Sequence, residues 1–269
     1  MTTPAVALTI AGSDSSGGAG IQADLRSFGA LGVFGATVLT AVTAQNTRGV
    51  RQVQVLPPAM VAAQLDAVLE DLPVAAVKTG MLANAALVEL VAARAEVGTL
   101  PALVVDPVLV AASGDRLLDE EAVAVYRQRL LPHARVLTPN LHEAGVLVGR
   151  ELASLADAEA AAHELAAFGP AVVVVKGGHL EGREATDVVV ADGQTTTLSA
   201  PRVATRNVHG TGCTFASATA AGLACGLDPH AALAQAKRYV SGAIAGAASW
   251  QIGAGHGPVD HLGFVAASR

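Results

Sequence analysis

Short apolar segments alternate along this chain with longer segments whose apolar residues recur at helical spacing. Residues 172–175 are four consecutive valines, as expected for a strand that is buried on both faces. From Pro58, which can begin a helix, apolar residues recur every three or four positions as far as Leu72. Strands that alternate with helices favour a parallel sheet with helices on both faces.

The same patterns predict elements along the whole chain. Strands are expected at residues 5–11, 36–42, 50–55, 74–78, 103–105, 136–137 and 172–175, with a hairpin formed by 186–190 and 195–198. Helices are expected at 20–31, 58–72, 84–95, 119–130, 142–147, 155–168, 212–224 and 229–248. Because no linker or repeat interrupts this alternation, we interpret residues 1–269 as a single domain.

Composition and charge narrow the possible functions. The formal net charge of -6, without a cluster of basic residues, argues against nucleic-acid binding. No apolar run reaches the roughly 20 residues that span a bilayer, and the N-terminus lacks the basic segment of a secretory signal. The two cysteines, Cys213 and Cys225, fall within one predicted helical region, which argues against a disulfide between them. We therefore expect a cytoplasmic protein without membrane or nucleic-acid partners.

The candidate chemistry lies in loops that follow strands, because ligands of open parallel sheets bind beyond the carboxyl ends of the strands. Gly210, Thr211 and Gly212 stand where a helix is expected to begin, and their backbone N–H groups could hold an oxyanion or a transferring phosphoryl group. Cys213 follows directly. A helix N-terminus lowers the pKa of a thiol toward neutrality, so Cys213 is a candidate general base. The alternative is a small cysteine that only fills space in the core.

Four further residues suggest a site for phosphate and a cation. Asp106 ends an apolar strand, and Lys176 ends the run of valines beside two glycines, where a buried ammonium group needs an anion. Asn140 and Glu143 have the spacing of a helix capping box, but they could also contact a hydrated Mg²⁺. Asp106, equally, could simply cap nearby amides. The residue types alone leave these alternatives open.

Two other segments admit different functions. The loop Gly18-Ala19-Gly20-Ile21-Gln22-Ala23 fits the loose dinucleotide pattern, although no carboxylate follows where that fold would hold a ribose. It could equally be a flexible turn. The amide of Gln45 complements a ring that carries an amino group beside a ring nitrogen, or it belongs to a solvated loop.

Seven segments, in order, resemble the hydroxymethylpyrimidine/phosphomethylpyrimidine kinases of thiamine biosynthesis, within the ribokinase-like superfamily. They are AGSDSSGGAGIQADLRSF, TAVTAQNTRGV, KTGML, VVDPV, LTPNLHEA, VVKGGH and HGTGCTFASA. The resemblance implies a three-layer α/β/α fold with a mostly parallel central sheet and a small lid. The segments after Gly12 and around residues 45–50 are the candidates for that lid.

The resemblance also implies roles for individual residues. ATP and Mg²⁺ would be the cofactors, with phosphates held by Lys176 and an anion hole of Gly210, Thr211 and Gly212 beside the base Cys213. The residues expected to organise the nucleotide and the metal, partly through water, are Asp106, Asn140 and Glu143, with Asp106 and Glu143 toward Mg²⁺. The residues expected around the aminopyrimidine are Gly12, Asp24, Gln45, Met81 and Val108.

The implied reaction is phosphorylation of the hydroxymethylpyrimidine and then of its monophosphate by a homodimer. The cysteine departs from the aspartate that is usual in the sugar kinases of the superfamily, which disfavours a sugar substrate. The nearest alternative is a pyridoxal/pyridoxine kinase on the same scaffold. Alternatives from other classes are an NAD(P)-dependent oxidoreductase that uses the Gly18–Ala23 loop and a binding protein without catalysis.

Overall fold

The computed structural model describes residues 3–109, 120–178 and 180–263. The strands of its larger sheet are β1 (Val6–Ala11), β2 (Phe34–Leu39), β5 (Val74–Thr79), β6 (Val104–Val105), β7 (Val136–Leu137), β8 (Val172–Val175), β9 (Glu184–Ala191) and β10 (Gln194–Pro201). The smaller sheet pairs β3 (Ala41–Asn46) with β4 (Gly49–Val55). The α-helices are α1 (Gly20–Ala30), α2 (Pro58–Leu69), α3 (Ala85–Glu96), α4 (Glu120–Val125), α5 (Leu141–Val148), α6 (Leu155–Ala166), α7 (Thr211–Ala224) and α8 (Pro229–Gly246).

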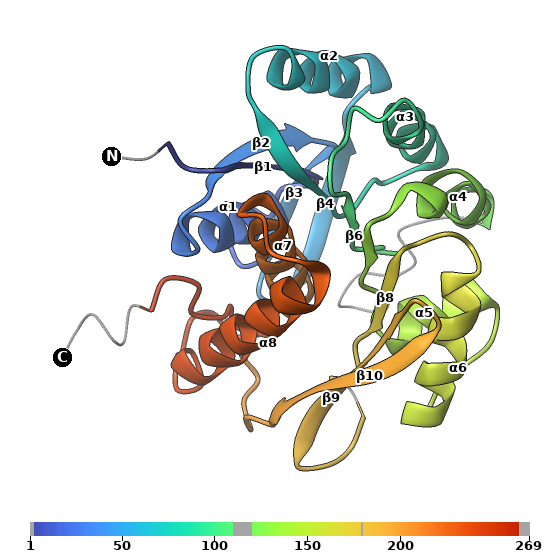
Figure 1. Ribbon diagram of the computed structural model, residues 1–269. Helices are drawn as coiled ribbons and strands as arrows, with labels where there is room; N and C mark the ends of the chain where they lie inside the picture. The colour runs from blue at the N-terminus through green and yellow to red at the C-terminus, as the bar shows by residue number, and fades with distance from the viewer. Residues whose placement is uncertain (1–2, 110–119, 179, 264–269) are drawn as a thin grey trace.

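The larger sheet has the topology expected from alternating strands and helices. Across the described residues its strand order is β10-β9-β8-β7-β6-β5-β1-β2. The strands from β8 to β2 run parallel, while β9 and β10 form an antiparallel hairpin at one edge. Figure 1 shows α1, α7 and α8 on one face of this sheet and α2 to α6 on the other. The mostly parallel, three-layer architecture predicted from the sequence is therefore confirmed.

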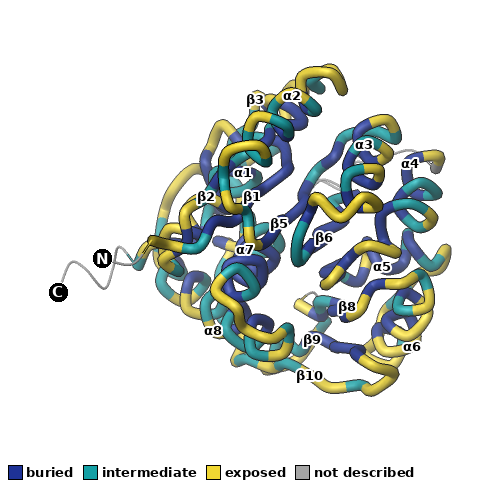
Figure 2. The backbone as a smooth tube through the Cα atoms, turned by 45° about the horizontal axis from the view of Figure 1, so that its top comes forward, coloured by how far each residue is buried: buried dark blue, intermediate teal, exposed yellow. Residues whose placement is uncertain are grey.

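Each face of the sheet has its own hydrophobic core, because successive side chains of a strand point to opposite faces. In β1, Leu8 packs with the core that includes α2 to α6, and Ala7 packs with the core that includes α1, α7 and α8. In β8, Val173 and Val172 divide in the same way. Figure 2 shows this buried layer between helices whose outer surfaces are exposed. The run of valines thus forms a strand buried on both faces, as predicted.

The predicted strand at 36–42 is wrong, because the chain there changes sheets. β2 ends at Leu39, and β3 begins at Ala41 in the smaller sheet. Thr40 occupies the corner and is fully buried. Its N–H donates to the carbonyl of Ala11, its carbonyl accepts from Leu56, and its hydroxyl donates to the carbonyl of Met81 at 2.7 Å. These bonds fix the corner but leave no signal in the pattern of apolar residues.

The helix predicted at 119–130 is also corrected. Asp119 lies outside the described residues, and α4 passes at Tyr126 into a π-helical turn, η1 (Tyr126–Leu130). A 3₁₀ turn, η2 (Leu131–His133), follows. Pro132 has no N–H for an α-helical hydrogen bond, so the regular helix cannot continue through it. By contrast, the β9–β10 hairpin is confirmed. The helix predicted from residue 84 is present as α3, and Asn84 caps it with a side chain that accepts from the Leu87 N–H.

A fully buried ion pair joins the two layers beneath the carboxyl edge of the sheet. The Nζ atom of Lys78 in β5 lies 3.0 and 2.9 Å from the two carboxylate oxygens of Asp24 in α1. Thr9 in β1 and Ser217 in α7 donate hydrogen bonds to the same carboxylate. Burial lowers the pKa of Lys78, but the negative charge of Asp24 more than offsets it, so its pKa lies above the ordinary value. The lysine therefore stays charged and ties four elements together.

We predict that Asp24→Asn lowers the free energy of unfolding by about 3–5 kcal/mol, because it leaves the Lys78 ammonium group buried without its counter-charge. Urea denaturation of the purified variant measures the change. Glu164→Gln is the matched control, because it removes the same charge from the half-exposed Arg150–Glu164 pair. That change is expected to cost less than about 1 kcal/mol. Equal losses in the two variants would contradict a stabilising role for the buried pair.

Candidate active site

The predicted site residues lie at one edge of the central sheet, because the parallel strands all end there. Gly12 follows β1, Met81 lies two residues beyond the end of β5, and Asp106 follows β6. Asn140 lies beyond the end of β7, and Lys176 directly follows β8. An isolated parallel bridge between Asn140 and Lys176 extends this edge beyond the regular strands. The sheet thus gathers residues that are far apart in the sequence.

The first turn of α7 faces Lys176 and Asp106. The helix begins at Thr211, and Gly210 caps it with a φ angle of 82°, a left-handed conformation that glycine adopts without strain. A Cβ atom on Gly212 would lie 3.3 Å from the Nζ atom of Lys176 and 3.8 Å from an Oδ atom of Asp106. The first-turn N–H groups of an α-helix lack partners within the helix and attract anions. These amides and the lysine can therefore act on the same anion.

Lys176 and Asp106 form an ion pair beside the first turn of α7. The lysine Nζ atom lies 2.9 Å from an Asp106 oxygen, which also accepts a hydrogen bond from Thr138 at 3.2 Å. Burial lowers the pKa of Lys176, but Asp106 and Glu143 outweigh that effect, so its pKa is raised. The ammonium group is therefore charged at neutral pH. Thr138 could not be predicted as a site residue, because a threonine at the end of a strand carries no distinguishing pattern.

Asn140 and Glu143 form the capping box that their spacing predicts. The Asn140 side chain accepts from the Glu143 N–H at 2.9 Å, and the Glu143 carboxylate accepts from the Asn140 N–H at 2.8 Å. Burial and the nearby negative charge of Asp106 raise the pKa of Glu143 to about 8, although Lys176 and the Asn140 amide act in the opposite direction. The cap therefore holds the Glu143 carboxyl group near enough to Asp106 for the two to repel each other when both are ionised.

This pair of carboxylates fits a hydrated magnesium ion. No group of three or more metal-ligating side chains occurs among the residues that the structure describes. A magnesium site, however, commonly uses only one or two carboxylates together with water and substrate phosphates. Burial and the charge of Asp106 keep Glu143 largely protonated at neutral pH, and a cation beside both carboxyl groups would favour its ionised form. Asp106 and Glu143 are thus the residues that could hold the ion, beside the anion-binding turn of α7.

Cys213 is the third residue of α7 and is only partly exposed. The N–H of Gly20, the first residue of α1, lies near enough to its sulfur to favour the thiolate. The prediction of a pKa near neutrality is wrong: burial raises the pKa of Cys213 to about 11. The charge of Lys78 and the Gly20 N–H favour the thiolate, whereas Asp24 and Asp106 disfavour it. Loss of hydration and two carboxylates outweigh the two helix N-termini.

Lys78 is the residue near Cys213 that the sequence analysis overlooked. Its ammonium group lies near enough to favour the thiolate, and it is fully buried at the end of β5. Like Lys176, it is a lysine near the end of an apolar strand. The signal was present in KTGML, since a buried ammonium group requires an anion in either place.

Four of the five residues predicted around the pyrimidine border the same edge. A Cβ atom on Gly12 would lie 2.5 Å from the terminal methyl carbon of Met81, so these two residues are in contact. Gln45 lies in β3, where its N–H donates to the Ser15 hydroxyl at 2.8 Å, which places the smaller sheet over the loop that follows β1. Val108 lies just after Asp106, with its N–H bonded to the Asp106 carbonyl at 2.9 Å.

Asp24 does not fit a role in direct substrate contact. Its side chain is 0% exposed, and both carboxylate oxygens are occupied by Lys78, Thr9 and Ser217. We correct that prediction and assign Asp24 to the support of Lys78. The dinucleotide interpretation of the Gly18–Ala23 loop fails for a similar reason, because the N–H groups of Gly18 and Ala19 both donate to the Asp14 carboxylate.

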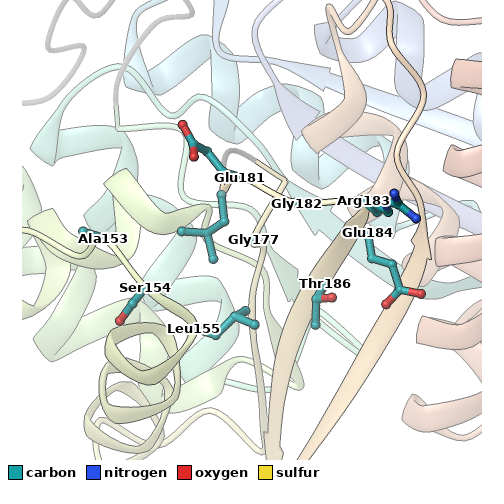
Figure 3. A pocket seen from close by; sticks show the side chains of 10 residues that line it. Ala153, Ser154, Leu155, Gly177, Glu181, Gly182, Arg183, Glu184 and Thr186 are labelled. Atoms are coloured by element: carbon teal, nitrogen blue, oxygen red, sulfur yellow. The ribbon is translucent and has the colours of Figure 1, made fainter.

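An open pocket of about 630 Å³ lies beside the loop that follows Lys176. Figure 3 shows Ser154 and Leu155 at the start of α6 on one side and Thr186 of β9 on the other, with Glu181 above. Its lining residues are Ala153, Ser154, Leu155, Gly177, Leu180, Glu181, Gly182, Arg183, Glu184 and Thr186. None of the predicted site residues lines it, so it is adjacent to the candidate site but distinct from it.

Comparison with known proteins identifies close relatives. The family model described as phosphomethylpyrimidine kinase matches residues 14–260. The hydroxymethylpyrimidine/phosphomethylpyrimidine kinase of Streptomyces coelicolor is 51% identical, with 96% of this chain and 95% of the relative covered. The kinase of the same name from Escherichia coli is 44% identical, with 95% and 97% covered.

Solved structures of related kinases share the fold. The pyridoxal kinase of Bacillus subtilis, in an ADP complex, superposes with a TM-score of 0.89 at 36% identity and covers 98% of this chain and 100% of its own. The phosphomethylpyrimidine kinase of Clostridium difficile 630 superposes with a TM-score of 0.79 at 39% identity and covers 89% and 99%. These neighbours confirm the ribokinase-like fold implied by the motifs.

We predict that alkylation of Cys213 by iodoacetamide accelerates with pH until the pH exceeds 10, because the thiolate is the reactive form and its pKa is about 11. The rate is measured by mass spectrometry in a Cys225→Ser background, which removes the other, exposed cysteine. A rate that levels off between pH 7 and 8 would show instead that the helix N-termini dominate the pKa of Cys213.

Proposed function

Because this chain belongs to the phosphomethylpyrimidine kinase family, we propose that it transfers the γ-phosphoryl group of ATP to 4-amino-5-hydroxymethyl-2-methylpyrimidine. The monophosphate is then phosphorylated a second time, and the product serves thiamine diphosphate synthesis. Relatives with this double name span nearly the whole chain. Two other relatives are named as bifunctional thiamine-biosynthesis proteins, and this chain spans about half of their length.

One observation supports this function above the others: the first turn of α7 meets Lys176 and Asp106 directly. The small separation between the Gly212 backbone and the Lys176 Nζ atom leaves the helix amides and the ammonium group facing one anion. Phosphoryl transfer depends mainly on alignment and on stabilisation of charge on the transferring group. Fixed donors in a site shielded from water provide that stabilisation at little cost in reorganisation.

In this proposal each group has a separate part in the transfer. Lys176 and the N–H groups of Thr211 and Gly212 hold the phosphoryl oxygens, while Gln45 orients the aminopyrimidine ring through its amide. The thiolate of Cys213 accepts the proton of the attacking hydroxyl. With a pKa of about 11 the thiol is largely protonated at neutral pH, so its proton must leave to solvent before the thiolate can act as the base, and the transfer becomes faster as the pH rises.

Asp106 and Glu143 would hold Mg²⁺, with water completing its coordination. A bound magnesium ion neutralises phosphate charge and helps to align the nucleotide. The chain's own contribution is the pair of carboxylates, fixed by the capping box on one side and by Lys176 on the other. Val108 and Met81 would border the ring, and the β3–β4 sheet that carries Gln45 would be the lid.

We expect the enzyme to form a homodimer and to act in the cytoplasm. The β3–β4 sheet and the start of α2 expose the apolar side chains of Val42, Val53 and Met60 at 47%, 39% and 53%. The register of the strands points Val42 and Val53 to opposite faces of the small sheet, so each face offers an apolar side chain for contact with a second subunit. Among the described residues, no helix has the length and apolar character needed to cross a membrane. The formal charge of -6 agrees with the absence of a nucleic-acid partner.

A pyridoxal kinase is the second candidate. Pyridoxal kinase structures, including one from Staphylococcus aureus in complex with AMP-PCP and pyridoxal, superpose at a TM-score of 0.89, above the 0.79 of the Clostridium difficile enzyme. Pyridoxal also carries a hydroxymethyl group on a flat nitrogen ring. Because the scaffolds are so similar, overall superposition cannot separate the two substrates, and turnover must decide.

We predict that the protein, supplied with ATP and Mg²⁺, turns over the hydroxymethylpyrimidine with a higher kcat/KM than pyridoxal and converts the monophosphate further to the diphosphate. Gln45→Leu should lower kcat/KM for the pyrimidine about 10- to 100-fold, since it leaves the ring amino group unpaired. Phosphorus NMR distinguishes the products.

Gln52→Leu is the matched control, because Gln52 is exposed in β4 and pairs with Ala44 rather than with Gln45. It should leave turnover unchanged. A strong preference of the unmodified protein for pyridoxal would refute the pyrimidine assignment.

A further inference from the structure

A nearly buried carboxylate, that of Asp14, organises the loop between β1 and α1. Its side chain is 2% exposed and accepts five hydrogen bonds. One oxygen accepts from the N–H and hydroxyl of Ser16 at 2.8 and 2.7 Å. The other accepts from Gly18 N–H at 3.1 Å, from Ala19 N–H at 2.8 Å and from the Nε2 atom of His209 at 2.8 Å. Residues 12–20 are called the substrate loop below.

The protonation of this pair follows from its environment. Burial raises the pKa of Asp14, but hydrogen bonds from His209 and Ser16 outweigh it, and the pKa falls well below its ordinary value. The carboxylate is therefore ionised and can only accept hydrogen bonds. It follows that the Nε2 atom of His209 carries a hydrogen and donates it to Asp14.

His209 belongs to a second loop, residues 207–212, which leads into α7 and is called the phosphate loop below. The two loops touch backbone to backbone. A Cβ atom on Gly210 would lie only 1.9 Å from the Gly18 carbonyl oxygen, and one on Gly18 would lie 2.6 Å from the Cδ2 atom of His209. Only glycines allow this approach. The Asp14–His209 hydrogen bond is the side-chain contact that closes it.

The other side of His209 is also fixed. Its backbone N–H donates to the Gly257 carbonyl at 3.0 Å, and it forms a parallel bridge with Pro258. The backbone of His209 is therefore fixed against the segment that follows α8. His209 is held between two parts of the chain, with its imidazole as the link to the substrate loop.

In the proposed reaction the substrate loop borders the pyrimidine, and the phosphate loop holds the transferring phosphoryl group. The substrate loop begins at Gly12, beside Met81, and ends at Gly20, whose N–H lies near enough to the sulfur of Cys213 to lower its pKa. The phosphate loop ends in the anion hole. We propose that the Asp14–His209 pair is a positioning device, which holds the anion hole and Cys213 in line with the hydroxyl that the substrate loop presents. This inference rests on the proposed function.

A positioning role and a purely stabilising role predict different kinetics for a variant of His209. A shift of about 1 Å between the loops would misalign the hydroxyl and the phosphoryl group, which costs about 100-fold in rate even when both substrates still bind. A role in stability alone would leave kcat of the folded protein unchanged. The split between kcat and KM therefore distinguishes the two.

The experiment compares His209→Leu with His209→Gln. Leucine removes the donor, whereas the glutamine amide can place an N–H near the position of Nε2. We expect His209→Leu to lower kcat for the pyrimidine about 100-fold with KM changed less than about threefold, and His209→Gln to recover most of that loss. The matched control is His230→Leu, the same change at an exposed position in the first turn of α8, which should leave kcat unchanged.

A second measurement does not depend on turnover. In the Cys225→Ser background, loosening the loops should let iodoacetamide alkylate Cys213 several-fold faster in His209→Leu than in His209→Gln. The proposal is overturned if His209→Leu retains kcat, if His209→Gln is as impaired as His209→Leu, or if the two variants are alkylated at the same rate. Should the unmodified protein phosphorylate no pyrimidine, the proposed function fails, while alkylation still tests the link between the loops.

Discussion

The ion pair between Lys176 and Asp106 beneath the first turn of α7 is the contact on which the site depends. It brings the end of β8 to the end of β6 and places a charged ammonium group beside the Gly212 backbone. Without its carboxylate partner, a lysine in this position would be costly to bury. Burial and the same carboxylate raise the pKa of Glu143 to about 8, so a magnesium ion that binds beside both carboxyl groups would displace the Glu143 proton. The lysine of this pair thus belongs to the anion site, and its aspartate belongs to the candidate magnesium site.

A second buried pair, Lys78 with Asp24, lies on the other side of Cys213, and the two pairs together explain the state of the thiol. Two ammonium groups and two helix N-termini favour the thiolate, but burial and the carboxylates of Asp24 and Asp106 raise its pKa to about 11. A neutral thiol adds no third negative charge to this crowded region. An aspartate in its place would add one, which gives a physical reason for a cysteine at the start of this helix.

The sequence predicted the architecture and the placement of most site residues, because both depend on local patterns. Apolar strands that alternate with helices determine the layers, and the residues after those strands, such as Asp106 and Lys176, must meet at one edge. The corner at Thr40 could not be predicted, since its hydrogen bonds join segments distant in the sequence. The pKa of Cys213 was mispredicted for a related reason: the helix N-terminus is visible in the sequence, whereas Asp24, Lys78 and the depth of burial are not. The same limit hid the partnership of Asp14 with His209, which are separated by 195 residues.

The most direct test of the central claim is the kcat of Lys176→Met with ATP and the hydroxymethylpyrimidine, measured beside the dissociation constant of the pyrimidine. If Lys176 and the amides of α7 hold the transferring phosphoryl group, kcat falls about 100- to 1,000-fold while the pyrimidine binds as before. A kcat within a few-fold of the unmodified protein would contradict the account, because the anion site would then lie elsewhere.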